Sequence, residues 1–279
     1  IVFTCAHASG RLQNLIERGA TYPANWLPVE VPCVEMVTSA WMLSCLARGA
    51  AAVAIMPCLD AAGLPGRVEG RVDFCGRMLE ALGETEDRIF LLPTSDESLL
   101  SVLHRPLPTP RVQFGDLPVS FPSGSSARVV QAVAAGYKAA ALAVAHPYSP
   151  FAIVHVVDGC TACGACADAC PTGALRLQHG AEAVLTFDAA RCVGCGLCLP
   201  VCPEPGVLRL RQATDLRSLA AGTVTLRRTS YQRCRVCGQP VAPEAMLQRI
   251  VALLGGENAP IAGVIEGLCL DCRSHQVVT

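Results

Sequence analysis

Residues 160–171 read CTACGACADACP, and residues 192–203 read CVGCGLCLPVCP. Both stretches follow the pattern C-x2-C-x2-C-x3-C-P, and every cysteine of the first recurs 32 residues later in the second. Small residues such as Gly164 and Gly196 let each loop turn tightly, so that neighbouring sulfur atoms converge. The chain is therefore organised around a duplicated loop that gathers thiolates.

Thiolates at this spacing are typical of 4Fe-4S clusters, and in domains with two such runs the fourth cysteine of each run ligates the other cluster. We therefore assign one 4Fe-4S cluster to Cys160, Cys163, Cys166 and Cys202, and a second to Cys192, Cys195, Cys198 and Cys170. Zinc knuckles are disfavoured because zinc usually takes two separated cysteine pairs. Disulfides are disfavoured because closely spaced cysteines on one loop cannot all reach suitable partners.

The sequence around the two runs supports one domain of α+β type over residues 151–211. Residues 153–157 and 183–187 alternate like short strands, and residues 175–177 and 208–210 have the pattern expected of a return strand in each half. Each half is thus predicted to be a strand, a cysteine loop, a short helix and a second strand. With its motifs, this region resembles the bacterial two-cluster ferredoxins.

Composition limits the classes of protein to which the chain can belong. Its 279 residues are enough for two or three domains, and a net charge of -1 gives no electrostatic support for binding nucleic acid. The apolar stretches 36–59 and 127–145 are interrupted by charged residues or proline, so no membrane span is predicted. The 17 cysteines fall in metal-type runs rather than a disulfide framework, which indicates a reducing compartment, the cytoplasm.

Residues 1–105 have the alternation of a small α/β domain. Short apolar runs at 1–5, 29–33, 51–57 and 88–92 are each followed by a helical pattern, at 11–18, 38–48, 71–82 and 96–103. This order predicts a parallel sheet covered on both faces. Three runs end in a cysteine, at Cys5, Cys33 and Cys58, and a parallel sheet brings its strand ends to one edge. The sequence leaves open whether these cysteines form a redox or metal site or are small buried apolar residues.

This region resembles the delta subunit of methyl-viologen-reducing hydrogenase, which links hydrogenase to heterodisulfide reductase and binds a 2Fe-2S cluster. The resemblance rests on Cys5, the Tyr22-Pro23-x-Asn25 turn, Cys33, Arg48-Gly49-Ala50 and Cys58. Two cysteines usual in that family are missing here, where Ala8 and Gly63 stand near their places.

Three strand-end cysteines leave a 2Fe-2S cluster one ligand short. Cys75, at the start of the third helix, is the first candidate for the fourth ligand, with His7 and Cys45 as alternatives. Burial in a helix is the simpler explanation for Cys45, and a solvated turn position the simpler one for His7. A degenerate domain kept only for docking competes with the cluster-binding interpretation.

Residues 106–123 contain five prolines and are predicted to form a semi-rigid linker. Serines and a glycine at 123–126 then predict the start of a helix that runs to about Ala145, within a packing segment over residues 124–150. Its apolar stripe is expected to pack against a neighbouring domain.

Residues 212–279 are predicted to form a small domain like a zinc ribbon. Two C-x2-C pairs enclose 31 residues and supply four thiolates, Cys234, Cys237, Cys269 and Cys272. Zinc is the default metal for such pairs, and a single iron is the alternative. Zinc ribbons often occur in nucleic-acid-binding proteins, but the few arginines around 227–235 favour a protein-docking face.

These features predict an electron-transfer subunit of a multidomain iron-sulfur type. Its clusters would exchange electrons with the protein subunits of a hydrogenase, formate dehydrogenase or heterodisulfide reductase, to which similar multidomain proteins belong. No catalytic triad or carboxylate pair stands out, so no catalytic residue is assigned. Two alternatives stay open: a thiol or disulfide reductase that uses Cys5, Cys33 and Cys58, and an iron-sulfur redox sensor.

Overall fold

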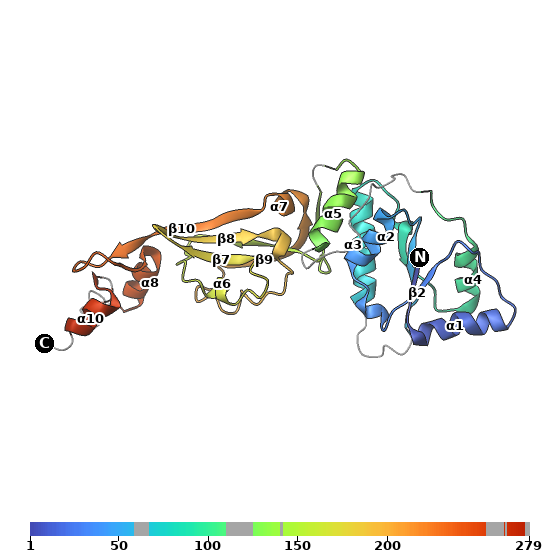
Figure 1. The fold of residues 1–279 in the computed structure, drawn as a ribbon, viewed down its shortest axis with the longest axis horizontal. Helices are drawn as coiled ribbons and strands as arrows, with labels where there is room; N and C mark the ends of the chain where they lie inside the picture. Colours follow the sequence, from blue (N-terminus) through green and yellow to red (C-terminus); the bar gives the residue numbers. More distant parts are fainter. Residues whose placement is uncertain (59–66, 110–124, 140–141, 255–264, 266, 277–279) are drawn as a thin grey trace. The chain divides into compact units, whose positions relative to one another are not determined.

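The computed structural model describes residues 1–58, 67–109, 125–139, 142–254, 265 and 267–276. The chain divides into two compact units, and Figure 1 gives the labels of their helices and strands. One unit contains residues 1–150 and 212–219, and the other contains residues 151–211 and 220–279. Within the described residues, no helix combines the length and apolar character needed to cross a bilayer.

The first unit contains the expected parallel sheet. Its strands are β1 (Val2–Thr4), β2 (Pro28–Glu30), β3 (Val53–Ile55) and β4 (Ile89–Leu91), in the order β2-β1-β3-β4. All three pairings are parallel, and the central strands β1 and β3 are completely buried. The apolar runs of the sequence therefore became interior strands, as a sheet covered on both faces requires.

Helices cover both faces of this sheet, as Figure 1 shows. They are α1 (Ala6–Glu17) and α4 (Asp96–His104) on one face, and α2 (Ser39–Ala47) and α3 (Arg67–Ala81) on the other, with the short helices η1 (Val34–Met36) and η2 (Glu86–Arg88) in the connections. Side-chain hydroxyl groups cap the N-termini of α2 and α4. Thr38 accepts a hydrogen bond from the Trp41 N–H, and Ser95 accepts one from the Ser98 N–H.

A buried ion pair joins the sheet to the next helix, α5 (Ser125–Gly136). Arg88 is fully buried; its guanidinium lies 3.2 Å from the Glu84 carboxylate and donates to the carbonyl oxygens of Ala50 and Ala51. Tyr137, which follows α5, donates to the same carboxylate at 2.8 Å. Burial and the Glu84 carboxylate raise the pKa of Tyr137 to about 12, so the phenol stays protonated as the donor. The segment after the linker is thereby fixed to the first unit.

The helix expected to run to Ala145 is shorter than predicted. It ends at Gly136, and Lys138 takes a positive φ of 53°, a left-handed conformation that closes a helix. Residues Ala143–Ala145 instead form β5, which pairs antiparallel with Ala213–Asp215. Most of the predicted linker, residues 110–123, lies outside the described residues.

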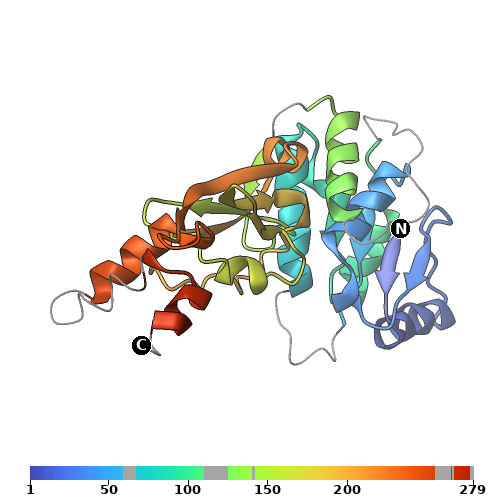
Figure 2. The ribbon, with the colours of Figure 1, turned by 60° about the vertical axis from the view of Figure 1, so that its left-hand side comes forward.

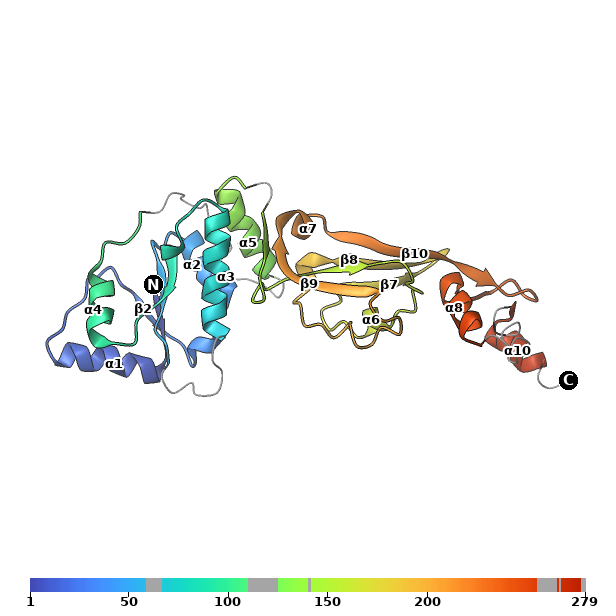
Figure 3. The same cartoon turned by 180° about the vertical axis from the view of Figure 1, so that it is seen from behind.

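The second unit contains the duplicated loops and the C-terminal cysteine pairs. Its strands are β6 (Ala152–Val156), β7 (Leu175–His179), β8 (Glu182–Asp188), β9 (Leu208–Asp215, whose end belongs to the first unit), β10 (Thr223–Arg233) and β11 (Pro240–Pro243). One sheet has the order β11-β10-β8-β7 with antiparallel pairings, and β9 lies next to β6. The long strand β10, orange in Figure 2 and Figure 3, runs along β8 toward the C-terminal helices.

The helices of this region are short. They are α6 (Ala165–Asp168), η3 (Ala189–Arg191), α8 (Glu244–Leu254) and α10 (Leu270–Gln276), whereas α7 (Leu216–Ala220), which follows β9, belongs up to Leu219 to the first unit. A short helix was expected in each half of the duplicated region, but only the first half has one, α6. The second half has a hydrogen-bonded turn from Leu199 N–H to the Gly196 carbonyl, because Pro200 has no N–H with which to continue a helix.

Candidate metal centres

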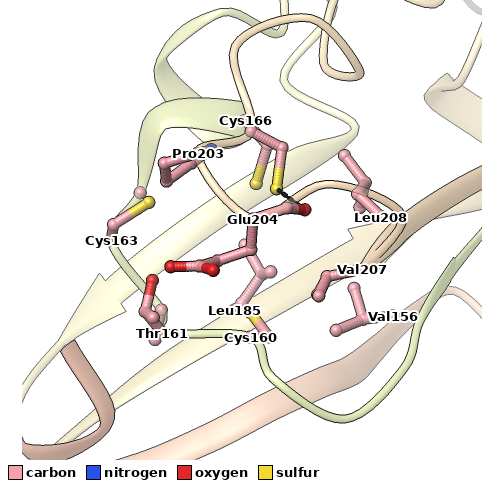
Figure 4. Close-up of a pocket in the computed structure, with 13 residues that line it drawn as sticks. Val156, Cys160, Thr161, Cys163, Cys166, Leu185, Pro203, Glu204, Val207 and Leu208 are labelled. Carbon is pink, nitrogen blue, oxygen red and sulfur yellow. Dashed lines mark hydrogen bonds between the residues drawn. The ribbon is translucent and has the colours of Figure 1, made fainter. Parts of the chain in front are cut away.

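The first cysteine loop curls around a hollow of about 370 Å³, drawn in Figure 4. Four sulfur-bearing side chains line it: Cys160, Cys163, Cys166 and Cys202. Three come from the first run and the last from the end of the second run. The remaining wall is mostly aliphatic, with Val156, Leu185, Val207 and Leu208. The hollow therefore presents four thiols against a mostly apolar wall.

Backbone geometry explains the curl of this loop. Gly164 has a φ of 89°, in the left-handed region that favours glycine, and it precedes the first turn of α6. A Cβ at this position would lie 3.0 Å from a methyl carbon of Leu177, so the strand packs directly on the glycine. Any larger residue at 164 would strain the turn that carries Cys163 and Cys166.

The second loop surrounds a separate hollow of about 320 Å³. Its cysteines are Cys192, Cys195 and Cys198 from the second run and Cys170 from the end of the first. Its wall is mostly apolar, with residues such as Val154, Leu175, Phe187 and Leu210, and no charged side chain lines it. The eight cysteines thus divide four and four between two hollows, and each run contributes its last cysteine to the hollow of the other.

The cysteine thiols around the hollows need a positive partner to ionise. Burial and then the neighbouring cysteine sulfurs raise the pKa of Cys166 to about 12, and burial also raises the pKa of Cys160, Cys192 and Cys198. Thiolates at these positions therefore depend on bound metal for compensating charge. Cys170 differs: burial acts to raise its pKa, but N–H groups such as that of Leu175, 3.5 Å away, lower it on balance.

Charged side chains lie beside the first hollow. Glu204 lines it, and the Arg249 guanidinium from α8 lies 3.0 Å from the Glu204 carboxylate. Arg227 on β10 is paired in register with Leu185, which also lines the hollow, and its Nε is buried without a hydrogen-bond partner. Its positive charge acts to lower the pKa of Cys160 against the larger effect of burial. Sequence reasoning missed these side chains, although Glu204 follows the cysteine-proline pair directly.

A third cysteine group lies near the C-terminus. The sulfur atoms of Cys234, Cys237, Cys269 and Cys272 all lie within 4.8 Å of one another, and those of Cys237 and Cys269 are 3.5 Å apart. N–H groups of Cys269 and Cys237 lower the pKa of Cys234 to about 6. Gly238, with a φ of 74°, closes the first turn by donating to the Cys234 carbonyl. Four thiols this close match the ligand shell of one tetrahedral metal ion.

The cysteines at the edge of the parallel sheet are not all brought together. Cys5, His7 and Cys58 have ligand atoms within 4.8 Å of one another. Cys33 is half-buried outside this group. Cys75 is completely buried on α3, where its sulfur lies 4.0 Å from the Ser39 carbonyl oxygen of α2 and burial raises its pKa to about 12.

Of the two alternative fourth ligands, His7 lies in this group and Cys45 does not. Burial raises the pKa of Cys45, which lies on α2 and outside the group, whereas His7 joins Cys5 and Cys58. His7 is a first-turn residue of α1, and only the folded sheet edge brings it near Cys58, which follows β3. The sequence named His7 as an alternative ligand, and its approach to Cys58 follows from β1 and β3 being neighbouring strands.

Family comparisons agree with the two main resemblances. Residues 159–207 match the family model of the 4Fe-4S dicluster domain, and residues 1–98 match that of methyl-viologen-reducing hydrogenase, delta subunit. No curated protein matches the chain. Both resemblances stated from the sequence are thereby confirmed, and the four-cysteine group near the C-terminus fits the third. The chain thus joins a region similar to a hydrogenase delta subunit to a region similar to 4Fe-4S dicluster domains.

Proposed function

We propose that this chain is an electron-transfer subunit that binds two 4Fe-4S clusters and relays electrons to or from a partner oxidoreductase. The proposed ligands are Cys160, Cys163, Cys166 and Cys202 for the first cluster, and Cys192, Cys195, Cys198 and Cys170 for the second. The observation that carries the proposal is the division of the eight cysteines, four and four, around two hollows.

The donor set fits such clusters. Each hollow offers four thiols, and none of these cysteines belongs to a group whose ligand atoms all lie within 4.8 Å, as the four C-terminal cysteines do. Wider spacing suits a cubane, in which each sulfur binds a different iron. When bound, such clusters accept and release single electrons. The aliphatic walls of this chain exclude water, and N–H groups such as that of Leu175 stabilise thiolate sulfur.

The second loop is the better candidate for electron exchange with a partner protein. Its side chains Val193, Leu197 and Leu199 are exposed, around the exposed ligand Cys195. Exposed apolar side chains that gather in one place are typical of interaction sites. The similarity of residues 1–98 to a hydrogenase delta subunit supports a partner of hydrogenase, formate dehydrogenase or heterodisulfide reductase type. Such thiol-rich sites fit the reducing cytoplasm.

We assign zinc to the C-terminal group, because paired C-x2-C turns that bring four thiolates together are typical of structural zinc sites. Its role is to hold the segment after β10 in place, since among the described residues Leu268 is the one buried residue that accompanies Cys234 and Cys269 in the core there. The first unit, in turn, is proposed to dock the partner. No electron step is assigned to a 2Fe-2S cluster held by Cys5, Cys33, Cys58 and Cys75, since the Cys75 sulfur lies beside the Ser39 carbonyl of α2 while Cys5 and Cys58 lie together with His7.

Anaerobic reconstitution of the full chain tests this function. We expect iron and acid-labile sulfide in equal amounts, enough for two 4Fe-4S clusters per chain. Dithionite should produce EPR signals of two interacting reduced clusters, and film voltammetry should show reversible one-electron waves. A colourless protein without acid-labile sulfide would rule the proposal out. Clusters that form but show no reversible wave would exclude the relay and favour a structural role.

A further inference from the structure

The first unit contains a group of metal-binding side chains that the relay does not use. Cys5 follows β1 directly, Cys58 follows β3, and His7 lies in the first turn of α1. Their ligand atoms all lie within 4.8 Å of one another. We propose that Cys5, His7 and Cys58 bind a single divalent transition-metal ion of the zinc type, with two sulfur ligands and one nitrogen ligand from this chain.

The scaffold explains why these three side chains meet. β1 and β3 are neighbouring parallel strands, with Phe3 in register with Ile55, so both chains leave the sheet at the same edge. Hydrogen bonds hold the start of α1: the Ala8 and Ser9 N–H groups both donate to the Cys5 carbonyl. The helix therefore begins directly after Cys5 and brings its second residue, His7, over the same edge. Buried strands and a fixed helix start make the site rigid before metal binds.

Ligand spacing distinguishes a single ion from a cluster. A tetrahedral zinc ion with bonds of about 2.0–2.3 Å places its ligand atoms roughly 3.5–3.8 Å apart. In the described part of the chain, three or more such ligand atoms lie within 4.8 Å of one another in two groups, the four C-terminal cysteines and Cys5, His7 and Cys58. The cysteines around the two cluster hollows do not. The site at the sheet edge therefore resembles the single-ion site of this molecule and not its cluster sites.

Charge and exposure agree with this assignment. Two thiolates and a neutral imidazole balance a divalent ion, and the partial positive charge at the start of α1 favours anionic ligands there. Cys5 is almost completely buried, whereas His7 is exposed, so one side of the ion would face solvent. Three protein ligands with an open position leave room for an exchangeable fourth ligand such as water. Cys33 and Cys75 lie outside this ligand set.

Metal analysis of His7→Ala in the full, cluster-loaded chain tests the site. We expect the variant to lose one zinc equivalent per chain, with iron and sulfide unchanged. When the metal-free variant is titrated with Co²⁺, we expect it to bind the ion at this site at least about a hundredfold more weakly than the metal-free wild type does. The reason is that losing a direct ligand costs more binding free energy than losing a supporting hydrogen bond. His7→Cys should restore the ion and add thiolate-to-cobalt absorption. Cys33→Ser and Cys75→Ser are the matched controls, and both variants should keep the zinc ion at this site.

Other outcomes would overturn the site. Equal zinc in wild type and His7→Ala would exclude His7 as a ligand. Loss of iron together with sulfide in His7→Ala would show a two-iron cluster instead of a single ion. Loss of the ion in Cys33→Ser or Cys75→Ser would show a different ligand set. Because His7 is exposed, its replacement spares the core, and unchanged far-UV circular dichroism would verify that. None of these results depends on whether the two 4Fe-4S clusters carry electrons.

Discussion

The two cysteine loops share their ligand spacing but differ at almost every position between the ligands. In the second loop Val193, Leu197 and Leu199 are large, apolar and exposed. The positions 32 residues earlier are occupied by Thr161, Ala165 and Ala167, and residues 160–171 contain no large apolar side chain. The loops share the ligand spacing and the turn glycines Gly164 and Gly196, whereas the other positions between the ligands differ.

The surroundings of the two hollows differ as well. Glu204, its partner Arg249 and the unpaired Nε of Arg227 lie beside the first hollow, whereas no charged side chain lines the second. A positive charge near a cluster stabilises the additional electron of its reduced form. On the proposed function, the charged side chains beside the first hollow would tune a reduction potential, and the exposed apolar side chains of the second loop would meet a protein partner.

Cys170→Ala has the largest expected effect, because it tests which cysteine belongs to which hollow. It should abolish the cluster in the second hollow and leave the one in the first, so about half of the iron and sulfide remains. Iron analysis and EPR measure the loss. Cys45→Ala, a cysteine outside both runs, is the control and should lose no iron. Cys202→Ala should have the mirror effect on the first hollow.

Arg227→Gln should lower the reduction potential of the first cluster only. Removing a partly buried positive charge costs the reduced form on the order of 1 kcal/mol, or about 40 mV for one electron. An EPR-monitored redox titration gives the shift. The matched control is Arg228→Gln, since Arg228 is exposed and paired with Glu182 at 2.7 Å. The single cluster left in Cys170→Ala should respond to Arg227→Gln, and the one left in Cys202→Ala should not. Equal responses would contradict the proposed assignment.

Features that depend on residues close together in the chain could be predicted from the sequence, whereas features that depend on distant residues could not. Cluster ligands lie within loops of a few residues, so their spacing is visible in the sequence. The parallel sheet was equally accessible, because β1 and β3 are continuous apolar runs. Helix ends were less predictable: the apolar pattern after Gly136 suits a strand as well as a helix, and Lys138 closes α5 through its own backbone conformation.

Long-range proximity could not be read from spacing. Cys75 was the first candidate for a fourth ligand because it opens a predicted helix, but the rotation of α3 directs it toward Ser39 of α2. His7 meets Cys58 only because β1 and β3 are adjacent, a property of strand order. The contact between Arg249 and Glu204 likewise depends on the position of α8, which follows β10 and β11 in the chain.

Arg249→Gln should have the smallest effect, and it tests whether the C-terminal module tunes the first cluster. Without Arg249, the Glu204 carboxylate keeps its negative charge beside the hollow, so the potential should fall. The shift should be about 20 mV or less, because the Arg249 side chain is 45% exposed and solvent screens it.

Glu204→Gln should raise the potential by a similar amount, and the double variant should return close to wild type. High salt should reduce the effect of Arg249→Gln more than that of Arg227→Gln, whose Nε is buried. Shifts of the same sign in both single variants would show that the pair acts through loop structure and not through charge.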